Sequence, residues 1–361
     1  MKERISVLGE KYGRAILRPI ATIAVALVIG MLFILPTGFS PLKAYGIIFK
    51  GAFGSSVGWL GTLAKATPLL FTGLAAAFAS WGGCFNIGIE GQLYMGAMAA
   101  ALVGHFCGGL PGVILIPLCL IAAMAAAVLW ALIPGLLNNK LEINIFIMFF
   151  IFNNIASLLT DYLASNPLRG ELVGVEATGR IAAQARFFRF SNYSDLNGGL
   201  LIALGLVLLF WFVQYKTRFG YECSAIGQNA TFGEYIGIRH ARRSMLVLTI
   251  SAMVAGLCGA EQTMGVLGRF YPNFSSDYGF TGISIGMLAN DNPIAVAIFA
   301  IFFGGLTYGG QQLESNSAIS SDLVRVIQAI VIMFISADFI VKKTRAKRRN
   351  KAREKQGREG A

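Results

Sequence analysis

The sequence predicts an all-α, polytopic membrane protein, a helical bundle of about ten spans, and three observations support this class. Of 361 residues, 55% are hydrophobic and 13% are charged, whereas soluble domains carry about 25% charged residues. Apolar stretches near the length needed to cross a bilayer, roughly 20 residues, recur along the chain. There are 43 glycines but only 18 acidic residues, too few to cover a water-exposed surface. A disordered chain, a disulfide scaffold and a nucleic-acid-binding globular domain are therefore excluded.

Ten apolar stretches are candidate spans. They are 17–36, 60–80, 92–108, 111–136, 143–163, 198–215, 244–264, 280–290, 293–311 and 323–341. The stretch 280–290 is too short to cross alone, so it either continues from 265–279 or forms a re-entrant segment. The first stretch has a basic start like that of a signal peptide, but it lacks a small-residue cleavage site before Pro36. We therefore expect it to be a retained helix.

The distribution of basic residues predicts the orientation, because cytoplasmic segments carry an excess of Lys and Arg. With ten crossings and a cytoplasmic amino terminus, 21 of the 30 basic residues lie on the cytoplasmic side, and ten of these are in the tail. We therefore expect a plasma (inner) membrane protein with both termini cytoplasmic. Its expected parts are a cytoplasmic N-terminus over 1–16, a transmembrane domain over 17–341 with a cytoplasmic loop over 216–243, and a basic cytoplasmic tail over 342–361.

The basic tail predicts a lipid partner rather than a nucleic acid. No aromatic residue interleaves its basic residues, as nucleic-acid stacking would require, and basic runs after a span are typical of tails held near anionic lipid. Signatures of soluble chemistry are also missing: there is no phosphate-binding loop, and His105 and His240 are too far apart in sequence to predict a zinc pair. The chain is predicted not to be an enzyme and to need no cofactor or metal.

The most informative stretch is 82–92, which joins two apolar spans with almost no loop. Its glycines and polar side chains are tolerated at membrane depth only where they are buried in protein or line a watery cavity. An intramembrane carboxylate is a functional candidate by default, so Asn86, Glu90 and Gln92 are candidate residues of a substrate path. The alternative is a tight cytoplasmic turn in which Asn86 and Glu90 cap the following helix.

A second polar cluster, Asn290 and Asp291, precedes the span that starts at Pro293. Both residues are further candidates for the substrate path, but the pattern favours capping of the next helix, with Asn292 as N-cap and Pro293 in the first turn. Glu261 closes another span, where an interfacial position explains it as readily as a pathway does.

The segment 216–243 alternates apolar and polar residues in a roughly helical pattern. Phe232, Tyr235 and Ile236 are unusually apolar for a solvated loop. A short amphipathic helix at a membrane face would suit docking into a groove of a partner protein. An ordinary solvated loop is the alternative.

These stretches together resemble the permease subunits of ABC importers, in the nucleoside (basic-membrane-protein-dependent) branch of the branched-chain amino acid/ribose-type permease family. The similarity rests on 67–74 (TPLLFTGL) and on 85–92 (FNIGIEGQ). It continues through 225–238, 251–260 and 278–293, so that it covers about 63–310. One departure is Ile145, where the family usually has an acidic residue, which suggests a divergent substrate preference.

The resemblance implies a type II importer-like fold and a set of partners. These are two ABC ATPase subunits, a second permease subunit that is identical or homologous, and an extracellular substrate-binding lipoprotein. It also implies that the 216–243 segment couples to the ATPases. The expected coupling residues are Glu222, Gly227, Asn229, Phe232, Glu234 and Gly237.

Three other functions stay open at this stage. One is an ABC permease for another neutral solute, such as a sugar or a purine base. The second is an ion-coupled secondary transporter, in which Glu90 and Asp291 would carry protons at broken helices. The third is a membrane anchor that assembles a complex without a transport path.

Overall fold

The structure, a computed structural model, describes most of residues 25–333 and divides into two compact units. Within this range, the residues not described are 26, 142–143, 172–173, 229–232, 234–236, 239, 318–319, 321 and 331. The larger unit covers 52–308, and the smaller one combines the chain up to Gly51 with the chain from Gly309. The described residues form helices and two isolated β-bridges but no strand, so the all-α prediction is confirmed for them.

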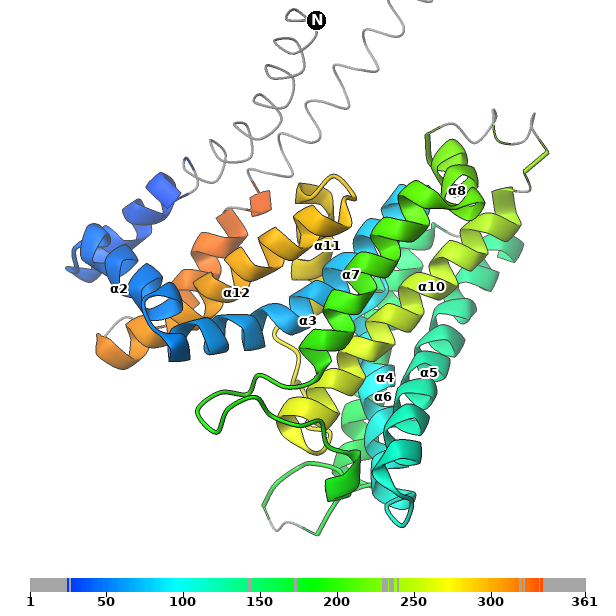
Figure 1. Cartoon of the computed structure of the whole chain (residues 1–361), viewed down its shortest axis with the longest axis horizontal. Helices are drawn as coiled ribbons and strands as arrows, with labels where there is room; N and C mark the ends of the chain where they lie inside the picture. The colour runs from blue at the N-terminus through cyan, green and yellow to red at the C-terminus, as the bar shows by residue number, and fades with distance from the viewer. Residues whose placement is uncertain are drawn as a thin grey trace, which may run out of the picture. The chain divides into compact units, whose positions relative to one another are not determined.

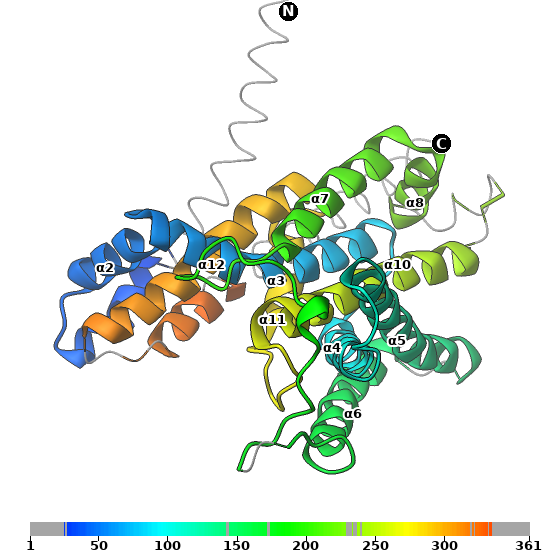
Figure 2. The same cartoon turned by 60° about the horizontal axis from the view of Figure 1, so that its bottom comes forward.

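Helices α3 (Ser56–Trp81), α4 (Ile89–Phe106) and α10 (His240–Glu261) form the core of the larger unit. Glycines allow their backbones to approach: a Cβ on Gly96 would lie 2.6 Å from the Gly256 backbone, and one on Gly259 would overlap the Leu93 carbonyl. The chain thus uses small residues at these helix contacts, as membrane helices commonly do. Figures 1 and 2 show α4 and α10 packed beside α5 (Gly112–Leu141).

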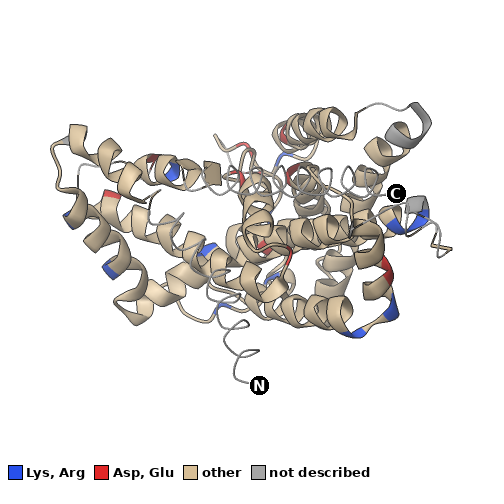
Figure 3. Ribbon diagram, turned by 90° about the horizontal axis from the view of Figure 1, so that it is seen from above, with Lys and Arg blue, Asp and Glu red and all other residues tan. Residues whose placement is uncertain are grey.

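The outer helices of this unit expose apolar side chains. Large hydrophobic residues are exposed on α5, on α6 (Ile145–Ser165) and on α7 (Gly199–Lys216), and Figure 3 shows how little of the described chain carries charge. In a water-soluble protein such surfaces would be unfavourable, whereas in a bilayer they face lipid. The chain is therefore a multi-pass membrane protein.

Six helices in the described residues are long and apolar enough to cross a membrane. They are α3, α5, α6, α7, α10 with the π-helical turn η3 (Gln262–Leu267), and α12 (Pro293–Asn316). The predicted total of about ten spans is not confirmed. Most of the stretch 17–36 and part of the stretch 323–341 lie outside the described residues. Helix α4 is not among the six, because Glu90, Gln92 and His105 lower its mean hydropathy.

Helix α11 (Tyr278–Leu288) has 11 residues, which at 1.5 Å per residue is about 16 Å, half the thickness of a bilayer core. It packs against α3, where a Cβ on Gly282 would overlap Thr72 and one on Gly286 would lie 2.9 Å from the Ala77 nitrogen. Since it starts beside Glu90 of α4, α11 begins within the helical bundle. This geometry agrees with the re-entrant alternative for 280–290.

Helix α8 (Arg218–Gln228) follows α7 directly and supplies the helix expected in the segment 216–243. Figure 1 shows it at one end of α7 and α10, with the described parts of the loop 166–198 at the opposite end. That loop contains one short 3-10 turn, η2 (Ala183–Ala185). The smaller unit includes the 3-10 turn η1 (Leu35–Thr37) and most of α2 (Pro41–Phe53), in which the Tyr45 hydroxyl donates to the Leu27 carbonyl over 2.7 Å.

Candidate functional site

The polar break between α3 and α4 is a glycine-rich turn packed against two other helices. Gly83 has φ +76°, a left-handed conformation that favours glycine. A Cβ at Gly83 would lie 2.9 Å from the Gly227 Cα of α8, and a Cβ at Gly82 would lie 2.7 Å from Val247 of α10. The turn therefore closes only because it lacks side chains where α8 and α10 approach it.

Asn86 and Gln92 form a reciprocal amide pair inside this break. Asn86 Nδ2 donates to Gln92 Oε1 over 2.9 Å, and Gln92 Nε2 donates to Asn86 Oδ1 over 3.0 Å. Asn86 Nδ2 also donates to Ser251 Oγ over 2.9 Å, and Ser251 Oγ donates to the Ala75 carbonyl over 2.7 Å. The pair thus links the break to both α3 and α10. Because all these groups are buried and satisfied, the network fixes the turn in one arrangement.

The network lies within the length of α10 rather than beyond its end. Arg243 is in the first turn of α10, and the eight-residue step from Arg243 to Ser251 is about 12 Å of helix. A cytoplasmic turn would instead be level with the basic residues that start α10. The geometry therefore favours a buried irregular segment over the cytoplasmic-turn alternative. One capping contact of that alternative is present: Asn86 Oδ1 accepts from the backbone N of Gly88, the residue before α4, over 2.9 Å.

Asn153 of α6 completes the break and was missed by sequence reasoning. Its Nδ2 donates to the Ile87 carbonyl, and its Oδ1 accepts from Gly91 N, both over 2.9 Å. These two backbone groups lie where α4 begins, and Asn153 satisfies both. The only sequence signal for this role was a polar Asn pair, Asn153 and Asn154, within an otherwise phenylalanine-rich span.

Glu90 lies where the first turns of two helices meet. It is in the first turn of α4, and its side chain is 7% exposed. Glu90 Oε2 accepts from Gly279 N over 2.6 Å, and Ser275 also hydrogen-bonds the carboxylate. Gly279 is the second residue of α11, where backbone N–H groups are free and the helix dipole is positive. The carboxylate therefore connects α4 to the start of the half-length helix α11.

The other predicted path residues, Asn290 and Asp291, lie at the far end of α11 from Glu90. From Gly279 to Leu288 helix α11 advances about 14 Å, and Asn290 and Asp291 lie in the turn that follows it. Both Asn290 and Asp291 have left-handed backbones, with φ +48° and +62°. Asp291 Oδ2 accepts from Ser80 Oγ over 3.1 Å at the end of α3. The structure therefore places Asn86, Glu90 and Gln92 in one region and Asn290 with Asp291 in another.

Asn292 caps α12 as the sequence predicted. Its Oδ1 accepts from Ile294 N over 2.9 Å and from Ala295 N over 3.2 Å, and Pro293 is the first helical residue. In the same corner, burial raises the pKa of the Asp291 carboxyl to about 6, while the hydrogen bond from Ser80 opposes part of that rise. The capping prediction is thus confirmed for Asn292.

Three of the predicted coupling residues, Asn229, Phe232 and Glu234, lie outside the described residues. Of the others, Glu222 forms an ion pair with Arg243 at the start of α10. Gly237 has φ +81° and is exposed.

Gly227 makes the contact between α8 and the polar break. A Cβ on Gly227 would overlap the Trp81 carbonyl and lie 3.1 Å from Gly83 N. No side chain separates the two backbones at this point, so a displacement of α8 would be transmitted directly to the turn.

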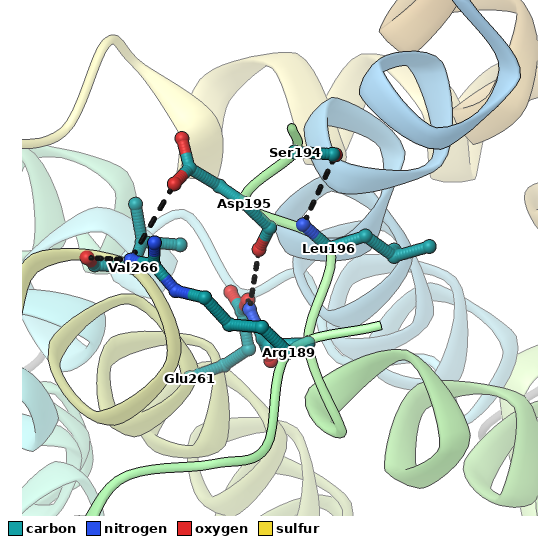
Figure 4. A network of polar contacts seen from close by, with 7 residues as sticks. Arg189, Ser194, Asp195, Leu196, Glu261 and Val266 are labelled. Atoms are coloured by element: carbon teal, nitrogen blue, oxygen red, sulfur yellow. Dashed lines mark hydrogen bonds and ion pairs between the residues drawn. The ribbon is translucent and has the colours of Figure 1, made fainter. Parts of the chain in front are cut away.

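Glu261 belongs to a buried network at the opposite end of α10. It is 1% exposed; its Oε1 accepts from Asn197 Nδ2 over 2.8 Å, and its Oε2 accepts from Gln262 Nε2 over 2.7 Å. Figure 4 shows the network continuing from Asn197, which donates to the Asp195 carbonyl, to Arg189, which pairs with the Asp195 carboxylate at 3.5 Å and donates to the Val266 carbonyl over 3.2 Å. Glu261 therefore anchors the end of the loop 166–198 to the π-helical turn.

In the part of the chain that the structure describes, no three His, Cys, Asp or Glu side chains are grouped closely enough to hold a metal ion. The groups available in the polar break are instead amides, hydroxyls, backbone N–H groups and one carboxylate. These groups can form hydrogen bonds with a polar solute.

Comparison with known proteins identifies a matching family and several relatives. Residues 58–336 match the family model described as "Branched-chain amino acid transport system / permease component". The guanosine ABC transporter permease protein NupP of Bacillus subtilis is 33% identical over 91% of this chain and 94% of its own length. The glucose ABC transporter permease protein TsgB13 of Haloferax volcanii is 32% identical over 91% and 88%, respectively. The nucleoside ABC transporter permease protein NupB of Lactococcus lactis is 28% identical over 95% and 98%.

Proposed function

Because this chain belongs to the permease-component family of branched-chain amino acid transport systems, we propose that it forms the translocation path of an ATP-driven importer for nucleosides. Two of the relatives described above carry nucleoside or guanosine transport in their names. ABC ATPase subunits and a substrate-binding protein are the partners that such a permease needs. Hydrolysis of ATP belongs to those partner subunits.

The single observation that carries this proposal is the contact of Gly227 with the polar break. In an ATP-driven importer, ATPase subunits on the cytoplasmic side must act on a translocation path inside the membrane. Gly227 in α8 meets the Trp81 carbonyl and Gly83, and the same turn continues into the Asn86–Gln92 pair. A secondary transporter would not require a cytoplasmic helix packed against its central break. The contact therefore favours ATP-driven coupling over ion coupling.

Within the path, we assign Asn86, Glu90 and Gln92 to the central region and Asn290 with Asp291 to its cytoplasmic end. The central groups are supported by their burial at helix breaks, where transporters typically bind substrate. Asn290 and Asp291 neighbour the ends of α3 and α7, since Gln214 Nε2 donates to the Asp291 carbonyl over 3.2 Å. Coupling to the ATPases is assigned to Glu222, Gly227 and Gly237, together with Asn229, Phe232 and Glu234.

The proposed orientation has both termini, α8 and the loop 216–243 in the cytoplasm, with the loop 166–198 outside. The basic residues support it, because Arg218, Arg242 and Arg243 gather around α8 and the start of α10. In this orientation an extracellular lipoprotein would deliver substrate to the side that holds Glu261. A second permease subunit, identical or homologous, would complete the path.

A sugar is the second candidate substrate, and the glucose permease relative favours it with nearly the same identity as the guanosine permease relative. Both solutes are neutral and rich in hydroxyl groups, which suits a path with few fixed charges. They differ in the nucleobase, which adds hydrogen-bonding edges and a stacking face.

Uptake in proteoliposomes tests the proposal. The full chain would be reconstituted with its ATPases and binding protein, and uptake of a labelled nucleoside panel and of glucose would be compared. We expect nucleoside uptake that requires ATP and that unlabelled glucose does not compete away. Uptake driven by a proton gradient without ATP would overturn the importer assignment, and ATP-dependent uptake of glucose alone would overturn the substrate.

A further inference from the structure

A basic cavity lies at the end of α4 remote from the polar break. Its volume is roughly 680 Å³, and its lining includes Arg169, Arg180 and Arg269. Arg169 and Arg180 come from the loop 166–198, and Arg269 comes from a distant segment that follows the π-helical turn η3. The only acidic residue in the lining is Glu171, so the cavity has an excess of positive charge.

Backbone hydrogen bonds bring the three arginines together. Arg169 forms a β-bridge with Thr178, and Gly170 N donates to the Ala177 carbonyl over 2.8 Å. On the other side, Thr178 N donates to the Phe270 carbonyl over 3.1 Å, and Phe270 N donates to Thr178 Oγ1 over 3.0 Å. Thr178 is thus held between the segment that carries Arg169 and the one that carries Arg269. The cavity is therefore a built feature of the fold.

His105 fixes the remaining wall. Its Nδ1 lies 2.9 Å from the Arg180 carbonyl, and its ring packs on Gly179, where a Cβ would lie 2.5 Å from the ring. Among the described residues, none of the guanidinium groups of Arg169, Arg180 and Arg269 has an ion-pair partner. Three guanidinium groups around one cavity repel one another, so an anion between them would relieve this repulsion.

The cavity is also amphipathic. Leu102 and Phe106 of α4 contribute to its lining, and the Phe106 side chain is 71% exposed. A soluble anion would use only the arginines, whereas a phospholipid would place its phosphate among them and its acyl chains along the apolar residues.

We propose that this cavity binds the phosphate group of an anionic phospholipid of the outer leaflet. Arginine forks match phosphate oxygens with paired hydrogen bonds, and the excess positive charge selects lipids with a net negative charge. The assignment to the outer leaflet rests on the orientation given under the proposed function. Basic residues on the outer side are an exception to the positive-inside tendency, and binding of a structural lipid accounts for them.

Binding of short-chain lipids to the purified full chain tests this site. The probes are dioctanoyl phosphatidylglycerol, dioctanoyl phosphatidylcholine and inorganic phosphate, titrated in neutral detergent below the micellar concentration of each lipid. We expect phosphatidylglycerol to bind about tenfold more tightly than phosphatidylcholine, because the quaternary ammonium of phosphatidylcholine would add a positive charge beside the arginines. The triple variant R169Q/R180Q/R269Q should lose this difference.

Arg325→Gln is the matched control, because Arg325 is an exposed arginine outside the cavity that pairs with Asp322 at 3.3 Å. It should keep the preference, and the basic tail contributes equally to every variant. An unchanged preference in the triple variant overturns the proposal, and so does inorganic phosphate binding as tightly as phosphatidylglycerol, which would indicate a soluble anion. If the triple variant does not fold, the single variants Arg269→Gln and Arg269→Lys replace it. We expect Arg269→Gln to lose the preference for phosphatidylglycerol and Arg269→Lys to keep part of it. Nucleoside uptake is measured separately, so a failed uptake with an intact lipid preference overturns only the transport assignment.

Discussion

At the residue scale, Glu90 offers a test of the central path. Glu90→Gln keeps an oxygen that accepts from Gly279 N but removes the charge that interacts with the positive end of α11. We expect a folded protein whose ATP-dependent uptake falls about tenfold, equivalent to roughly 1.4 kcal/mol. Exposed Glu314 provides the control, because Glu314→Gln should leave uptake unchanged. Wild-type uptake by Glu90→Gln would mean that the charge has no role in transport.

Two neighbouring asparagines of α6 allow the structural role of Asn153 to be tested, because only Asn153 contacts the polar break. Asn153→Ala leaves Gly91 N and the Ile87 carbonyl without partners, and each buried unsatisfied group costs about 1–3 kcal/mol. Asn154 is exposed and only donates to the Phe150 carbonyl of its own helix over 2.9 Å. Thermal unfolding in nanodiscs should show a lower midpoint for Asn153→Ala and little change for Asn154→Ala. Equal midpoints would show that Asn153 does not hold the break.

At the element scale, the corner between α11 and α12 should respond to pH through Asp291. Its folded pKa of about 6 lies above the ordinary value of 3.8, so the folded state holds the proton more strongly than the unfolded state does. The free energy of unfolding therefore falls as pH rises from about 4 to about 6. Asp291→Asn removes this titration and suits the left-handed backbone, which asparagine tolerates.

The measurement is the difference in unfolding midpoint between Asp291→Asn and wild type at several pH values. We expect the unfolding midpoint of the variant to rise relative to that of the wild type between pH 4 and pH 6. The difference should stay the same at pH 7. A constant difference over this range would show that Asp291 is not buried as described.

The helices also show what the sequence could predict. Apolar length located α3, α5, α6, α7, α10 and α12 well, because each is a long run with few charges. The start of α4 was placed at 92, since Glu90 and Gln92 lower the local hydropathy, yet the helix begins at Ile89. Asn153 escaped prediction for a different reason. Its partners Ile87 and Gly91 lie more than sixty residues away, and spacing along the chain carries no information about such contacts.

At the scale of the whole molecule, the orientation makes a prediction about accessibility. In a variant without native cysteines, Tyr193→Cys in the loop 166–198 should react with a membrane-impermeant maleimide in intact cells. Tyr221→Cys in α8 should react only after the membrane is permeabilised. Both tyrosines are highly exposed, at 83% and 67%, so burial does not limit either reaction. The reverse pattern would invert the proposed topology.

The central claim is that motor subunits act on the path through the contact of α8 with the polar break. The most direct test compares Gly227→Ala with Gly205→Ala, measuring nucleoside molecules imported per ATP hydrolysed in the reconstituted transporter. A methyl group on Gly227 would overlap the Trp81 carbonyl, whereas Gly205 of α7 has open space around it. The account predicts that Gly227→Ala hydrolyses ATP with little import, while Gly205→Ala keeps the wild-type ratio. A wild-type ratio in both variants would contradict it.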